Sequence, residues 1–119
     1  MMRLQKKKPR QSLEGRLQLE IIKMVRSLGY AIGKNKTVGI FRDGRFSKDQ
    51  YVFRGFPDLT MFVPELVFCE VKAPKGRMSQ DQIEFEKLCT KAGIRYIVAR
   101  KIEDVVEVIN NKKSSDFKK

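Results

Sequence analysis

Two carboxylates and a lysine near the middle of the chain, Asp58, Glu70 and Lys72, are the residues whose types and spacing best suit chemistry. Asp58 stands just before one strand-like run, residues 59–63, and Glu70 lies near the end of a second run, residues 66–72. If the two runs form an antiparallel hairpin, Asp58 and Glu70 lie opposite each other to within one register step, with Cβ atoms about 5 Å apart. Lys72 shares a strand face with Glu70, because side chains alternate with period two.

Two carboxylates held this close repel each other unless a cation lies between them or one takes up a proton. Mg²⁺ and Mn²⁺ prefer hard oxygen ligands, and the Val71 carbonyl would add one more to Asp58 and Glu70. Such a metal polarises a phosphate and acidifies a bound water. Lys72 would orient that water and stabilise developing negative charge. The set therefore predicts metal-dependent hydrolysis of a phosphodiester. The alternative is a cross-strand salt bridge. However, Glu70 interrupts an apolar strand, and burying a carboxylate there without a functional role costs folding free energy.

Composition narrows the class of protein. The 119 residues suit one domain, and 26 Lys and Arg against 14 Asp and Glu give a net charge of +12. This excess favours a polyanionic partner, nucleic acid first and an anionic membrane second. The absence of histidine excludes His-based zinc sites, His-dependent nucleases and Ser-His-Asp catalysis. Cys69 and Cys89 lack metal-ligand spacing and are expected to be reduced and buried. No apolar run approaches the ~20 residues of a membrane helix, so we expect an intracellular protein. We also expect it to use no small-molecule cofactor.

Local patterns predict the order of elements along the chain. They are a basic disordered arm over residues 1–11, a helix capped by Ser12 and ending near Leu28, a strand starting at residues 30–33, a hairpin with an Asp43-Gly44 turn, the hairpin of residues 59–72, a helix over residues 79–92, a strand over residues 94–99, a helix over residues 102–110 and a polar tail over residues 112–119. One domain would span residues 12–111.

The expected fold class is α/β, with a central mixed sheet flanked by helices. Residues 66–71 are apolar on both faces, which predicts a central strand. Helical spacing predicts the inward-facing residues of the first and last helices, which are Leu17, Ile21, Val25 and Leu28, and Val105, Val106 and Ile109.

Three motifs in order carry a family resemblance: Gly55-x-Pro57-Asp58-Leu59, Glu70-x-Lys72 and Gly76-x-x-Ser79-x-x-Gln82. The stretch over residues 13–100 resembles the virus-type replication-repair nuclease family, VRR-NUC, of the PD-(D/E)xK superfamily. The resemblance implies a restriction-endonuclease-like core and a Mg²⁺- or Mn²⁺-dependent DNA endonuclease. It also implies a glutamate in the first helix, about fifteen residues before a helix-ending glycine, and Glu14 and Gly29 match.

Glu14 and Gln82 each have two readings. The resemblance implies that Glu14 assists at the metal, directly or through water, whereas a first-turn glutamate is also favoured by the helix dipole alone. Glu20 competes with Glu14 as the helix acid, but its charged neighbours indicate a solvated pairing. Gln82 completes a Ser79-x-x-Gln82 capping box, and the resemblance also places it beside the lysine or the scissile phosphate.

Basic residues flank the motifs on both sides and are candidates for contacting DNA phosphates. They are Lys34, Lys36, Arg42, Arg45, Arg54, Lys75 and Arg77. For any one of them ordinary surface charge is the alternative. The aromatic residues before Asp58 are expected in the core or in a dimer interface.

The substrate stays open among three hypotheses. Small stand-alone members of the family, from phages and bacteria, resemble homodimeric Holliday junction resolvases, which would act on branched DNA in the cytoplasm of a bacterial or phage-infected cell. A C2 dimer supplies the two symmetric cuts that a four-way junction needs. A monomeric flap or nicking endonuclease is the second hypothesis. The third is a non-catalytic, basic DNA-binding module whose acids form structural salt bridges.

Overall fold

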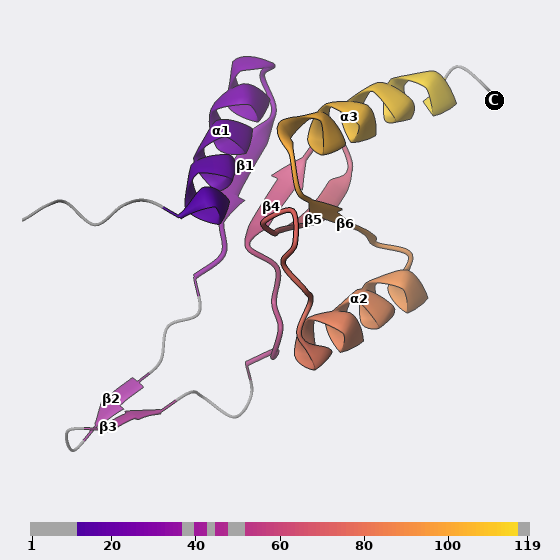
Figure 1. Cartoon of the computed structure of the whole chain (residues 1–119). Helices are drawn as coiled ribbons and strands as arrows, with labels where there is room; N and C mark the ends of the chain where they lie inside the picture. The colour runs from indigo at the N-terminus through magenta and orange to yellow at the C-terminus, as the bar shows by residue number, and fades with distance from the viewer. Residues whose placement is uncertain (1–11, 37–39, 43–44, 48–51, 117–119) are drawn as a thin grey trace, which may run out of the picture.

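A computed structural model describes residues 12–36, 40–42, 45–47 and 52–116 (Figure 1). The expected basic arm, the Asp43-Gly44 turn, Tyr51 and the last three residues of the expected tail lie outside this description, as do the side chains of residues 40–47 and 112–116.

Within the described residues, three helices and six strands follow in the predicted order, but the last helix runs to Asp116 instead of ending near residue 110. They are α1 (Leu13–Ser27), β1 (Ala31–Lys34), β2 (Ile40–Arg42), β3 (Arg45–Ser47), β4 (Leu59–Phe62), β5 (Leu66–Val71), α2 (Gln80–Ala92), β6 (Arg95–Ala99) and α3 (Ile102–Asp116). Ser12 and Ser79 cap α1 and α2, and Gly93 ends α2 in the left-handed region at φ 72°. These local signals placed the ends of both helices correctly.

Four strands form a mixed sheet in the order β1-β4-β5-β6. β5 pairs with β4 antiparallel and with β6 parallel, so the prediction of a central strand at residues 66–71 is confirmed. β2 and β3 pair only with each other among the described strands, with Arg42 opposite Arg45. The α/β fold class is therefore confirmed.

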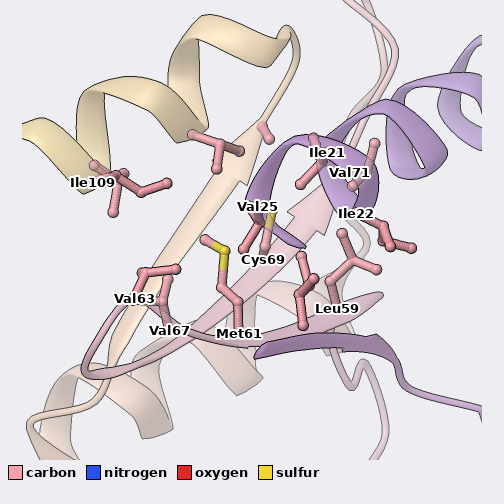
Figure 2. Packing of buried hydrophobic residues seen from close by; sticks show 14 residues of the cluster. Ile21, Ile22, Val25, Leu59, Met61, Val63, Val67, Cys69, Val71 and Ile109 are labelled. Carbon is pink, nitrogen blue, oxygen red and sulfur yellow. The ribbon is translucent and has the colours of Figure 1, made fainter. Parts of the chain in front are cut away.

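Helices cover both faces of the sheet, α1 and α3 on one face and α2 on the other (Figure 1). The α1/α3 face holds the main core, where Ile21 and Val25 pack over Leu59, Met61 and Cys69 (Figure 2). Residues 67, 69 and 71 supply this core because odd-numbered side chains of β5 point to one face, which leaves Phe68 and Glu70 for the α2 face.

Two of the expected core residues lie elsewhere. Leu28 is the C-cap of α1 and is 55% exposed, because the chain leaves the helix there, and Ile22 is buried instead. Val106 is 37% exposed while Val108 is buried. The buried stripe of α3 consists of Val105, Val108 and Ile109. Val106 comes one residue after Val105, and this step turns its side chain about 100° away from the stripe.

An aromatic cluster fills the α2 face. The Phe85 ring of α2 lies 5.0 Å from Phe56, 5.7 Å from Phe68 and 5.5 Å from Phe53, centroid to centroid. Phe56 is partly buried in this cluster, as expected for a core residue, whereas Phe53 remains 60% exposed.

The two cysteines are free and buried, as expected. Burial, followed by the charge of Asp58, raises the pKa of the Cys69 thiol to about 12. None of the described helices is long and apolar enough to cross a membrane.

Candidate active site

The β4–β5 hairpin sets Asp58 across from Glu70. Leu59 pairs with Cys69 at the end of the ladder, and the same register, continued by one residue, places residue 58 opposite residue 70. The Oδ2 atom of Asp58 accepts a hydrogen bond of 2.8 Å from the Val71 amide. The predicted register is therefore the observed one, and two carboxylates meet where β5 ends.

Glu70 is the buried acid of the site. Its side chain is 3% exposed, and its Oε1 atom is buried without a hydrogen-bond partner among the described residues. Burial, and next the negative charge of Asp58, raise the pKa of Glu70 to about 8, although the Lys72 ammonium opposes that rise. A buried carboxylate oxygen beside a second carboxylate needs either a proton or a cation.

Lys72 lies on the same face as Glu70, as the strand period predicts. Its Nζ atom is 3.8 Å from the Oε2 atom of Glu70, and its side chain is 14% exposed. The Lys72 amide donates to the Ala99 carbonyl at 3.0 Å, which continues the β5–β6 pairing past Val71. The ammonium is thus held at the rim of the carboxylate pair.

Gln82 makes the predicted capping bond and also contacts Glu70, whereas the resemblance implied a place beside the lysine or the scissile phosphate. Its Oε1 atom accepts from the Ser79 amide at 2.8 Å, which closes the capping box of α2. Its Nε2 atom donates to the Oε2 atom of Glu70 at 3.0 Å. The cap fixes which end of the amide faces the sheet, because only the oxygen can accept from the Ser79 N–H. The N-terminus of α2 is thereby tied to Glu70.

Gly55 lets the Asp58 loop approach α2. It has φ +70°, and a Cβ atom at this position would lie 2.3 Å from the Asp81 carbonyl carbon and 2.5 Å from the Gln82 nitrogen. A side chain would therefore collide with the first turn of α2. Glycine at the start of the Gly55-x-Pro57-Asp58 motif is required by this close backbone contact.

Glu14 reaches the loop after Lys72 rather than the carboxylate pair itself. Its Oε1 atom accepts a hydrogen bond of 3.2 Å from the Ala73 amide. Within the described part of the chain, no three His, Cys, Asp or Glu side chains lie close enough to hold a metal together. Asp58 and Glu70 therefore form a two-carboxylate site, and a role for Glu14 at the metal stays a prediction.

The donor set nevertheless fits a hard divalent cation. Glu70 offers a buried oxygen with no other described partner, Asp58 offers a second carboxylate, and the Val71 carbonyl follows Glu70 directly. Mg²⁺ is usually held by one or two carboxylates together with waters and phosphate oxygens. These protein ligands are therefore enough for an ion whose remaining ligands are waters and phosphate oxygens.

Residues that the sequence did not single out position these groups. The backbone N–H of Asn35 donates to the Asp58 carbonyl at 2.8 Å. In the Asn35 side chain, Nδ2 donates to the Pro57 carbonyl at 3.1 Å and Oδ1 accepts from Thr60 Oγ1 at 2.9 Å. The Nη1 atom of Arg100 donates to three carbonyls of the loop after Lys72. These belong to Ala73, Pro74 and Gly76, at 2.9, 3.3 and 2.7 Å. No local pattern marks Asn35 or Arg100, because the partners of their side chains lie 22 or more residues away.

The structure describes the side chains of five of the seven residues that are predicted to contact phosphates. Lys34, Lys36, Arg54, Lys75 and Arg77 are exposed. Arg42 and Arg45 are paired in the β2–β3 ladder, and their side chains lie outside the described part of the structure. Lys75 and Arg77 lie in the loop after Lys72, and Arg54 precedes Gly55, so basic residues flank the two carboxylates on both sides along the sequence.

The raised pKa of Glu70 predicts how stability depends on pH without metal. Between about pH 4.5 and 8 the folded protein keeps the Glu70 proton that the unfolded chain releases. Stability should therefore fall as pH rises through this window, by at most about 1.4 kcal/mol per pH unit from this group. We expect Glu70→Gln, which mimics the protonated acid, to lack this component when urea unfolding is measured in EDTA. Equal pH slopes for the two proteins would contradict the assignment.

Comparison with known proteins agrees with this architecture. The family model of the VRR-NUC domain matches residues 31–101. A solved structure described as a VRR_NUC domain is similar in fold, with a TM-score of 0.59 and 24% identity over 82% of this chain and 94% of the other. No curated protein matches the chain. Because the family model spans well over half of the chain, including the Asp58 and Glu70-x-Lys72 motifs, the chain belongs to the VRR-NUC family of nuclease domains.

Proposed function

We propose that this protein is a Mg²⁺- or Mn²⁺-dependent DNA endonuclease whose site is built by Asp58, Glu70, Lys72 and Gln82. The observation that carries the proposal is the buried Oε1 atom of Glu70, which has no hydrogen-bond partner among the described residues although the Asp58 carboxylate lies nearby. A structural salt bridge would satisfy both oxygens of a buried carboxylate. Here Lys72 and Gln82 both contact Oε2 and leave Oε1 for a ligand.

Asp58, Glu70 and the Val71 carbonyl would hold the metal. When bound, the metal would polarise the scissile phosphate and lower the pKa of a water. The Val71 amide orients Asp58, and Gln82 orients Glu70, so both carboxylates are fixed before a ligand arrives. Glu14 would support the site through the Ala73 amide or through a water.

Lys72 would act on the nucleophile and on the charge that develops at phosphorus. Its ammonium is tethered 3.8 Å from Glu70 and is mostly withdrawn from solvent, so few competing waters screen it. A fixed ammonium in such a place stabilises an anionic transition state more than it stabilises the ground state. It would also orient the attacking water.

DNA binding would rest on phosphate contacts. The net charge of +12 gives a general attraction to DNA, and the exposed Lys34, Lys36, Arg54, Lys75 and Arg77 would add local contacts, together with Arg42 and Arg45. Such binding weakens steeply with salt and carries little sequence information. We therefore propose recognition of DNA shape.

Within this class we propose a homodimeric resolvase of four-way junctions. One carboxylate site cuts one strand, and two symmetric cuts need two sites related by a twofold axis. A monomeric flap or nicking endonuclease remains the alternative, and a non-catalytic DNA-binding module is the hypothesis of another class. The three differ in their products and in the mass of the protein in solution.

The test uses labelled DNA of matched sequence, as an immobile four-way junction, a 5′-flap, a splayed arm and a plain duplex, each in Mg²⁺, Mn²⁺ or EDTA. We expect paired symmetric nicks on the junction, and a dimer by light scattering. Cleavage only at flap or single-stranded borders by a monomer would retain the nuclease and overturn the resolvase. Tight binding without cleavage in either metal would leave the binding module.

A further inference from the structure

A pocket opens beside the proposed site, and Lys72 belongs to both. It has a volume of about 230 Å³ and lies between α1 and the loop after β5. This exceeds what a single water needs and falls below the ~300–1,000 Å³ of pockets for drug-sized ligands. Its size therefore suits one compact organic group bound next to the scissile phosphate.

The walls of this pocket combine apolar surface with positive charge. Leu13 and Leu17 of α1 face Ala73 and Pro74 of the loop across it. Its charged lining comprises three cations and one acid, which are Arg16, Lys72, Arg100 and Glu20. An apolar body that carries a negative charge is complementary to this lining.

The loop side of the pocket is held in place before any ligand binds. Arg100 bonds the carbonyls of Ala73, Pro74 and Gly76, and Glu14 accepts from the Ala73 amide. The Arg100 and Lys101 amides both donate to the Asp104 carboxylate, at 2.8 and 3.2 Å, which anchors Arg100 to the start of α3. A wall fixed in this way loses little conformational entropy when a ligand binds.

We propose that this pocket accepts one unpaired nucleotide of the DNA strand being cut. Its base would lie against the Leu13, Leu17 and Pro74 side chains, and its phosphates would face Lys72 and Arg16. A base pair within a duplex cannot enter, because its two bases stay stacked and joined to each other. The inference rests on the proposed nuclease function and adds that the nucleotide next to the cut is unpaired. At a four-way junction, the base pair at the crossover would have to open to supply it.

The test measures binding of the full chain in EDTA, so that no cleavage occurs. The probes are a short fluorescent single-stranded oligonucleotide and an all-abasic oligomer with the same number of phosphates. We expect the wild type to bind the base-bearing probe more tightly. Leu13→Ala should weaken that binding about three- to tenfold and leave the abasic probe unchanged. The substitution is compatible with folding, because Leu13 is 62% exposed.

Leu28→Ala is the matched control, since Leu28 lies at the other end of α1, is 55% exposed and does not line the pocket. Equal affinity of the wild type for both probes, or equal effects of Leu13→Ala and Leu28→Ala, would overturn the pocket. Cleavage assays with metal give a separate result. A protein that prefers the base-bearing probe but never cuts DNA refutes the nuclease, whereas cleavage without base preference refutes only the pocket.

Discussion

Glu70→Gln should abolish metal-dependent DNA cleavage, with a fall in kcat of about 10³-fold or more. The substitution keeps an oxygen for the Gln82 amide and gives Asp58 a hydrogen-bond donor, so the fold should persist. It removes the negative charge that a divalent ion needs at the buried Oε1 position. Single-turnover cleavage of junction DNA in Mg²⁺ and Mn²⁺ measures the effect.

Lys72→Ala makes this prediction specific, because Lys72 is proposed to act in the chemistry and not as a ligand. It should lower kcat by about 10²–10³-fold but preserve the rise in melting temperature that Mn²⁺ gives the wild type. Glu70→Gln should lose both the activity and that rise. Glu107→Gln, an exposed change on α3, should alter neither.

Full activity of Lys72→Ala would refute the assigned site, and an unchanged Mn²⁺ shift in Glu70→Gln would place the metal elsewhere.

Gly55→Ala should be the most destabilising single-methyl change in the Asp58 loop. A left-handed residue with a side chain costs about 1–2 kcal/mol, and the collision with the backbone of Asp81 and Gln82 adds about 1–3 kcal/mol of overpacking. We expect a loss of about 2–4 kcal/mol in urea unfolding. Relief of the collision would also pull Gln82 from Glu70 and lower cleavage.

Gly93 supplies the control for backbone conformation alone. Its φ is +72°, close to the +70° of Gly55, but a Cβ atom there would meet nothing within 4 Å. Gly93→Ala should therefore show only the left-handed penalty of about 1–2 kcal/mol and leave cleavage intact. Equal destabilisation by the two substitutions would show that the contact between the Asp58 loop and α2 contributes nothing.

Local geometry made several features predictable from sequence. The pairing of residues 58 and 70 follows from a turn midway between them, and the shared face of Glu70 and Lys72 follows from the strand period. The caps at Ser12 and Ser79 follow from hydrogen bonds that span three residues. The wrong predictions at Leu28 and Val106 have different causes. The chain leaves α1 at Leu28, whereas Val106 lies one residue step away from the buried stripe of α3.

The sequence by itself thus determined the order of the elements, the register that sets two carboxylates opposite each other, and the nuclease family. Only the tertiary structure decided that Gln82 contacts Glu70, that Asn35 holds the Asp58 backbone, and that Arg100 clamps the loop after Lys72. The physical reason is distance along the chain. Strand period and capping act between near neighbours, whereas these contacts depend on how helices and strands that are 12 to 27 residues apart pack together.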